Sequence, residues 1–122
     1  MKISSFMMLT ILSSAIATQQ FAELSFEQKT IKFPNSPEGV VLVHYLKFSN
    51  TGSEPLIFET YKVSCPCTKV QFPSYPIPPG ASDSLLVTFD TKGKYYYQDR
   101  EILIFSNSKK KVEKIRVKVF VQ

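Results

Sequence analysis

Apolar residues recur at every second position along much of this chain, and this alternation restricts its fold more than any other feature. Near the carboxyl terminus, the apolar set Ile115, Val117, Val119 and Val121 alternates with Arg116, Lys118 and Phe120. Successive side chains of a β-strand point to opposite faces, so the pattern predicts a strand with one buried face. After residue 17, apolar residues nowhere follow helical spacing over a helix-length window. The chain is therefore predicted to be all-β.

Further strands are predicted on the same grounds, and turn-forming residues separate them. Predicted strands cover 40–49, 56–63, 84–89 and the region of Ile102 and Ile104, with a bulge near Glu59 and Thr60. The turns fall at Asn50–Ser53, Pro76–Gly80, Thr91–Lys94 and Ser106–Ser108. Six or seven short strands, with turn signals about every 8 to 12 residues, are typical of a sandwich or barrel.

The amino terminus has the layout of a secretory signal peptide. Lys2 precedes an apolar run from Ile3 to Ile16, and Ala15-Ile16-Ala17 offers a small-x-small cleavage site. The run is shorter than the roughly 20 apolar residues of a membrane span. We expect cleavage after Ala17, with residues 18–122 as one exported domain in the periplasm or outside the cell and no stable membrane span in the mature chain. An uncleaved anchor of the same composition is the alternative.

Basic residues are spread along the chain rather than gathered into a binding patch. Loss of Lys2 with the signal lowers the formal net charge from +5 to +4. The one dense cluster, Lys109-Lys110-Lys111, stands between two strand-like segments, where a solvated turn is the usual structure. With no Trp and no second basic stripe, we expect no nucleic-acid partner.

Four local strings resemble a known bacterial family. They are Phe48-Ser49-Asn50-Thr51-Gly52 with Pro55-Leu56, Ser64-Cys65-Pro66-Cys67-Thr68, Pro76-Ile77-Pro78-Pro79-Gly80, and Val87-Thr88-Phe89-Asp90-Thr91-Lys92-Gly93. Their order and spacing resemble the domain of unknown function 1573, a family related to Hydin-like immunoglobulin domains and frequent in exported proteins of Bacteroidota. The resemblance covers about residues 24–121. It implies an immunoglobulin-like β-sandwich of about seven antiparallel strands, and it carries no established activity or catalytic residue.

Cys65 and Cys67 are the only cysteines, and three interpretations of the pair stay open. The family usually has Gly between them, whereas Pro66 here fixes φ and removes an N–H. In an extended chain their Cα atoms would lie roughly 6 to 7 Å apart, so a disulfide needs a bend at Pro66. A local disulfide or buried thiol pair is the favoured interpretation. Thiol-disulfide exchange and Cu(I) binding by two thiolates are the alternatives.

Signatures of enzymes and of closed metal sites are otherwise missing from the sequence. His44 is the sole histidine, with no nucleophile elbow nearby, and it shares the parity of Leu42 and Leu46 as a core-edge residue would. Asp83, Asp90 and Asp99 lack calcium-loop spacing, so turn and solvated-face roles explain them. We expect no catalysis, cofactor, resident metal or small-molecule substrate.

Tyr95-Tyr96-Tyr97 is the candidate contact surface. Alternation in a strand would expose at least one ring, and exposed Tyr often marks binding surfaces, although packing at a sheet edge explains it equally well. The sequence thus favours a non-catalytic binding or structural module that contacts an unidentified protein of the cell envelope through a sheet face or edge. The alternative is a small envelope redox or copper-binding protein that uses Cys65 and Cys67.

Overall fold

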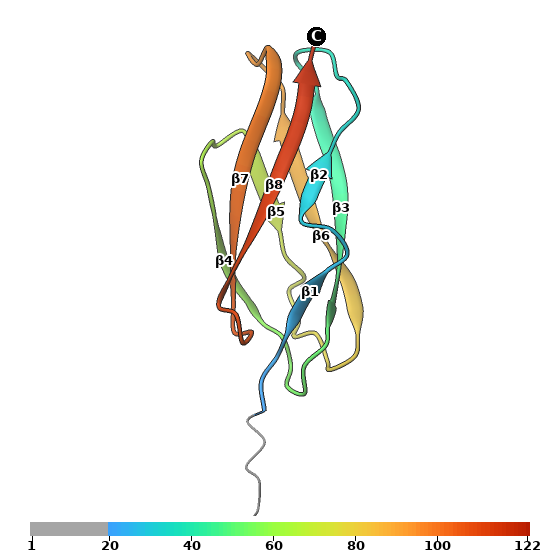
Figure 1. The fold of residues 1–122 in the computed structure, drawn as a ribbon, viewed down its shortest axis with the longest axis vertical. Helices are drawn as coiled ribbons and strands as arrows, with labels where there is room; N and C mark the ends of the chain where they lie inside the picture. The colour runs from blue at the N-terminus through green and yellow to red at the C-terminus, as the bar shows by residue number, and fades with distance from the viewer. Residues whose placement is uncertain (1–19) are drawn as a thin grey trace, which may run out of the picture.

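A computed structural model describes residues 20–122, which form eight β-strands and no helix (Figure 1). The strands are β1 (Leu24–Phe26), β2 (Thr30–Lys32), β3 (Val41–Asn50), β4 (Phe58–Val63), β5 (Thr68–Gln71), β6 (Ser82–Asp90), β7 (Tyr96–Ser106) and β8 (Val112–Val121). The expected signal peptide, residues 1–17, lies outside the described residues. The prediction of an all-β chain is confirmed for the described part.

The strands form two four-stranded sheets that pack face to face (Figure 1). One sheet has the order β1-β3-β6-β5, and the other has the order β2-β8-β7-β4. All the strand pairs are antiparallel except β2 with β8, which run parallel with Ile31 beside Val117. The sandwich thus has eight strands where about seven antiparallel ones were expected, and the amino-terminal segment contributes two short strands, one to each sheet.

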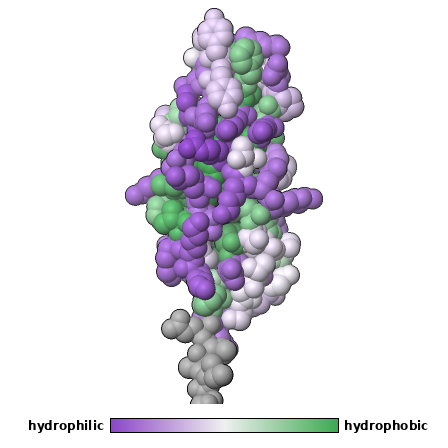
Figure 2. All heavy atoms as spheres, in the orientation of Figure 1, coloured by the Kyte–Doolittle hydropathy of each residue, from purple (hydrophilic) through white to green (hydrophobic). Residues whose placement is uncertain are grey.

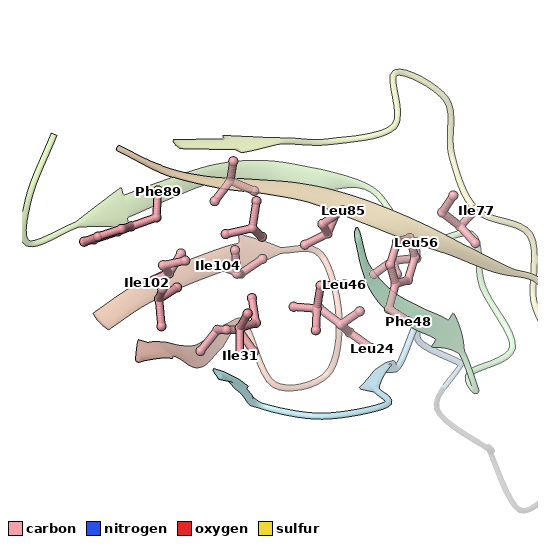
Figure 3. Close-up of a cluster of buried hydrophobic side chains, with 14 of the residues drawn as sticks. Leu24, Ile31, Leu46, Phe48, Leu56, Ile77, Leu85, Phe89, Ile102 and Ile104 are labelled. Carbon is pink, nitrogen blue, oxygen red and sulfur yellow. The ribbon is translucent and has the colours of Figure 1, made fainter. Parts of the chain in front are cut away.

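Apolar side chains from both sheets meet in one core between the layers (Figure 3). Leu46 and Leu85 come from one sheet and Ile102 and Ile104 from the other, and each of the four is no more than 1% exposed. The alternating set of β8 predicted to be buried is buried throughout. Burying a side chain of this size contributes roughly 1.5 to 3 kcal/mol, so the two-residue period supplies most of the drive for folding.

Aromatic rings line the side of the sandwich between β4 and β5. Phe58 lies edge-on to Phe48 and stacks on Phe72, with ring centroids 5.0 Å apart in both pairs. Tyr61 meets Phe72 edge-on at 5.9 Å. The register shift between Phe58 and Thr60 confirms the predicted bulge. This bulge lets both Phe58 and Tyr61 pack against the core although they are three residues apart.

The Asn-Thr-Gly string at the end of β3 has a structural role that depends on the side chain of Asn50. Its fully buried amide accepts from the N–H groups of Glu23 and Gly52 at 3.2 and 3.0 Å, and it donates to the carbonyls of Glu54 and Ile77 at 2.7 and 3.0 Å. Gly52 is required because a Cβ there would collide with the backbone of residues 21–23. The amino-terminal segment is thereby fixed against the β3–β4 connection.

Candidate functional site

The three consecutive tyrosines lie together at one end of the molecule, at the start of β7. Tyr95, Tyr96 and Tyr97 are 59%, 74% and 60% exposed. A turn precedes them, in which the Lys94 N–H donates to the Thr91 carbonyl at 3.0 Å. Tyr96 has a φ of 66°, a left-handed conformation rare for a residue with a side chain. This break in the extended backbone allows all three rings to face solvent, where simple alternation would expose at least one.

Phe120 on β8 extends the tyrosine surface. It is 41% exposed and lies opposite Tyr97 in the strand register, and its ring centroid is 6.5 Å from that of Tyr96. Figure 2 shows pale and green side chains gathered at this end of the molecule, next to a broad purple region over the same face. The sequence pattern placed Phe120 on the mostly charged face of its strand but did not connect it with the tyrosines.

A second exposed apolar surface, which the sequence analysis missed, lies on the outer face of β3. Val41, Val43 and Tyr45 point away from the core and are 59%, 53% and 65% exposed. Leu86 of β6 lies beside Tyr45 in the register and is half-buried on the same face. The available signal was that β3 carries apolar residues at both parities, a pattern typical of a strand covered on two faces.

The same part of β3 has an unpaired edge. β1 pairs only with residues Phe48–Asn50, and the next contact along this edge is the Glu27 N–H donating to the Lys47 carbonyl at 3.0 Å. The ladder to β6 uses the backbone groups of the even-numbered residues, as the Asn50 N–H to Ala81 carbonyl bond shows. The N–H and C=O groups of Val41, Val43 and Tyr45 therefore point outward, and no other described strand pairs with them.

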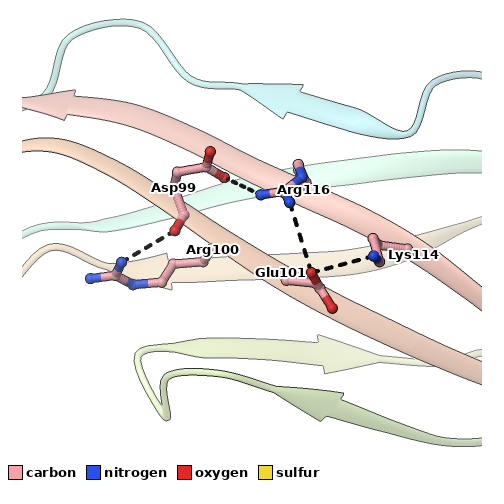
Figure 4. A network of polar contacts seen from close by, with 5 residues as sticks. All are labelled: Asp99, Arg100, Glu101, Lys114 and Arg116. Atoms are coloured by element: carbon pink, nitrogen blue, oxygen red, sulfur yellow. Dashed lines mark hydrogen bonds and ion pairs between the residues drawn. The ribbon is translucent and has the colours of Figure 1, made fainter.

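The outer face of the other sheet is charged. Arg116 of β8 donates to the Asp99 carboxylate of β7 at 3.0 Å and lies 3.9 Å from the Glu101 carboxylate, which is 3.7 Å from the Lys114 ammonium (Figure 4). Arg100, one residue along β7, donates to the backbone carbonyl of Asp99 at 3.2 Å (Figure 4) and to the side-chain carbonyl of Gln98 at 2.7 Å. We refer to the four residues Asp99, Glu101, Lys114 and Arg116 as the charge ladder.

Cys65 and Cys67 form a disulfide in the connection that crosses from β4 in one sheet to β5 in the other. The Thr68 N–H donates to the Cys65 carbonyl at 3.1 Å, which closes a four-residue turn with Pro66 in its second position. Pro favours that position because its φ is already set near −65°. The turn brings the two Cα atoms to 5.2 Å, so the bend that the sequence analysis required is present.

Pro66 is compatible with the fold because neither Pro66 nor Cys67 has a positive φ, so the turn does not need glycine at either position. Cys67 packs against the core, and its carbonyl accepts from the Asp90 N–H at 2.8 Å. Both cysteines are half-buried. In this state neither sulfur is a free thiolate that could bind Cu(I).

The remaining candidate residues have local structural partners. His44 is half-buried beside Phe33, with ring centroids 6.1 Å apart, and its Nε2 lies 3.3 Å from the side-chain nitrogen of Gln28. Asp90 accepts from the Lys92 N–H at 2.9 Å in a turn. Across residues 20–122, no group of three or more His, Cys, Asp or Glu residues is placed to hold a metal ion.

One polar contact borders the apolar face of β3. Tyr75 donates its hydroxyl to the Asp83 carboxylate, which also accepts from the Ser84 N–H at 2.7 Å. The Tyr75 hydrogen bond, followed by the Ser84 one, holds the pKa of Asp83 below its ordinary value. The same hydrogen bond raises the pKa of Tyr75. Tyr45, Tyr75, Asp83 and Leu86 together line a shallow hollow beside β3.

The fold has counterparts among solved structures at low sequence identity. A protein of unknown function from Porphyromonas gingivalis W83 aligns with a TM-score of 0.73 and 18% identity, over 87% of this chain and 50% of that one. The ASH/PapD-like domain 7 of human CEP192 aligns with a TM-score of 0.64 and 12% identity, over 93% and 95% of the two chains. The VesB protease of Vibrio cholerae aligns with a TM-score of 0.60 and 14% identity, over 82% and 32%.

These likenesses show the class of the fold, an immunoglobulin-like β-sandwich. The chain spans about half the length of the Porphyromonas gingivalis protein. Residues 24–121 match the family described as protein of unknown function DUF1573, and the chain belongs to that family. The family membership expected from the sequence is thus confirmed. No curated protein matches the chain, and residues 20–122 contain no helix long and apolar enough to cross a membrane.

Proposed function

We propose that this protein is exported and acts as a non-catalytic binding module that contacts another protein of the cell envelope. The observation that carries the proposal is the open segment of β3, defined here as residues 41–45, which combines an unpaired edge with an exposed apolar face. The partner supplies an extended segment that adds to the sheet beside β3, with apolar residues at alternate positions.

The other free edges of the sandwich have features that discourage pairing. β1 and β2 have three residues each, β5 has four and carries exposed Lys69, and β4 carries a bulge with exposed Glu59 and Lys62. Short strands, charges and bulges are the usual means of preventing association between edges. The open segment of β3 has none of them, and three of its five residues are exposed and apolar. An edge of this kind is stable in solution when a partner covers it.

Export is supported by the sequence of residues 1–17, with cleavage after Ala17. Intact-mass measurement of the protein recovered from outside the cytoplasm tests this part. A mass that begins at Thr18 supports it, and a full-length chain retained in the membrane contradicts it.

A photo-reactive amino acid at position 43 tests the contact in cells, with position 62 on the outer face of the other sheet as the matched control. We expect crosslinks to one extended segment of a partner from position 43 and none to that segment from position 62. A synthetic peptide of this segment should then slow hydrogen exchange at the N–H groups of Val43 and Tyr45, because strand addition places them in new hydrogen bonds.

Substitutions at Val43 separate strand addition from general adhesion. Val43→Pro removes the outward N–H at an edge position where proline is tolerated, whereas Val43→Thr keeps it. We expect Val43→Pro to weaken peptide binding by at least about tenfold and Val43→Thr to weaken it much less. Equal binding by the two folded variants, or equal crosslinking from positions 43 and 62, would contradict the proposal.

The redox and copper alternative predicts a different dependence. A Cys65→Ser, Cys67→Ser double variant should keep its partner and its crosslinks if the open segment of β3 makes the contact. Stoichiometric uptake of Cu(I), or reduction of a test disulfide by the purified protein, would instead support the cysteine pair as the functional site.

A further inference from the structure

We propose a second binding site, for an acidic sugar residue of a polysaccharide, in the hollow on the outer face of β8 near its carboxyl end. The hollow has a volume of about 310 Å³, at the lower end of the range for small-ligand sites. Its lining residues include Lys32, Phe33, Asn35, Tyr97, Lys118 and Phe120. None of them belongs to the open segment of β3, so this proposal is independent of the proposed protein contact and is tested separately.

Two of the residues that line the hollow are lysines, which supply positive charge. Lys32 and Lys118 are neighbours in the parallel register of β2 and β8, and the Phe33 N–H donates to the Lys118 carbonyl at 2.9 Å. Neither lysine forms an ion pair with any residue of 20–122. Asp99 lies opposite Lys118 in the β7–β8 register, but its carboxylate is bonded to Arg116. Like charges on adjacent strands repel, and a bound carboxylate or sulfate would relieve this repulsion.

Two exposed aromatic rings also line the hollow. Tyr97 and Phe120 lie directly opposite each other on β7 and β8, and more than a third of each is exposed. Large exposed rings at this position gain nothing from the core, so they are available for contact. The C–H face of a sugar ring is apolar and packs against an aromatic face, while its hydroxyls and acidic group stay at the edge. The Asn35 amide is exposed at the rim, where it can donate to a sugar oxygen and accept from a hydroxyl.

The combination of charge, rings and shape selects this ligand class. A simple anion would contact the lysines but not the aromatic rings. A neutral sugar would contact the rings but would not pair with the lysines. The surface of an anionic membrane would satisfy both kinds of residue, but it is flat and extended, whereas these residues line a shallow hollow of about 310 Å³, the size of one small group. An acidic sugar uses the lysines, the aromatic rings and the concave shape together.

Titration with oligogalacturonate tests the proposal by calorimetry and by amide chemical shifts in the mature protein. A neutral glucan oligomer of equal length, citrate, and vesicles of anionic lipid are the comparison probes. We expect oligogalacturonate to bind and to shift the amides of residues 97 and 118–120, with neutral glucan and citrate at least about tenfold weaker. A Lys32→Gln, Lys118→Gln double variant and Tyr97→Ala should each weaken binding by about tenfold or more, whereas Lys69→Gln on the other sheet should not.

Several results would overturn the proposal. Citrate binding as tightly as oligogalacturonate would reduce the site to an anion site. Binding to anionic vesicles that excess oligogalacturonate does not displace would make it a membrane contact. Absence of saturable binding to the acidic oligomer, or equal binding by the Tyr97→Ala and wild-type proteins, would remove the site altogether. Melting temperatures of all the variants identify any that fail to fold.

Discussion

The two outer faces of the sandwich differ in character although their sheets have the same number of strands. Beyond the aromatic rings at its end, the face of β7 and β8 carries the charge ladder, with acids on β7 opposite bases on β8. The face of β3 carries Val41, Val43 and Tyr45, each more than half exposed. The inner faces alone explain folding, because both sheets bury the same kind of side chain in one core. The difference therefore reflects what each outer face meets in solution.

A charge ladder suits a face that meets only water, because cross-strand pairs satisfy each other and discourage apolar contact. A face such as that of β3 adds little to the stability of the isolated chain and leaves apolar area exposed. Exposed apolar residues gathered beside an unpaired edge are typical of interaction sites. The comparison thus supports the proposal that β3 makes the protein contact, with the charge ladder as a protective face.

The largest expected effect on stability comes from comparing the inward-facing and outward-facing residues of β3. Leu46→Ala removes a buried side chain from the core, and we expect it to lower the free energy of unfolding by about 2 to 5 kcal/mol. Val43→Ala truncates an exposed side chain three residues earlier, and we expect a change of about 0.5 kcal/mol or less. Urea unfolding of both variants measures the contrast. Equal losses would mean that the outer face of β3 is packed against another part of the chain.

The crossover between the two sheets should give the next largest effect. Replacing Cys65 and Cys67 by Ser removes a disulfide that closes a three-residue loop, and the loop-entropy model gives a loss on the order of 1 to 2 kcal/mol. Unfolding of the oxidised wild type and the double variant measures it. If reduction of the wild type changes its stability by a different amount than the double substitution does, serine itself disturbs the turn.

Much of the fold could be predicted because single strands carry their own pattern. The buried set of β8 and the bulge at Glu59 and Thr60 follow from the spacing of apolar residues within one segment. β1, β2 and β5 were not predicted, because strands of three or four residues depend on their partners across the sheet rather than on a pattern of their own. The parallel pairing of β2 with β8 is a property of two distant segments and has no local signal.

The candidate site was predicted less well, for a related reason. The tyrosines and cysteines are unusual strings, so a single pass along the sequence finds them. The open segment of β3 is defined by the absence of other residues packed on it. Alternation in the sequence placed Val40, Leu42, Leu46 and Phe48 on one face of this strand. The apolar residues on its other face, Val41, Val43 and Tyr45, can be read from the sequence. Whether a strand is covered on one face or on both depends on the order of the strands in the sheets, which the sequence does not show. Tyr96 likewise departs from alternation through its backbone, which no neighbouring residue type required.

The charge ladder should contribute modestly and in a salt-dependent way. Arg116 lies between two carboxylates, and because all these groups are partly exposed we expect Arg116→Ala to cost about 0.5 to 1 kcal/mol at low salt. Most of this loss should disappear at about 1 M salt, where the screening length falls to about 3 Å. Lys69→Ala on the other sheet is the control, since Lys69 forms no ion pair among the described residues. A loss that persists in high salt would mean that Arg116 acts by packing its stem over β7.

The smallest effect concerns the Tyr75–Asp83 contact beside the apolar face. Because the pKa of Asp83 is lower in the folded protein than its ordinary value of 3.8, its ionised form stabilises the fold above that pH. This contribution should decline as the pH falls through the lowered pKa and vanish below it. Asp83→Asn should therefore melt slightly below the wild type at pH 7, and the two melting temperatures should converge in acid, below the lowered pKa of Asp83. A gap that widens in acid would mean that the contact favours the protonated carboxyl.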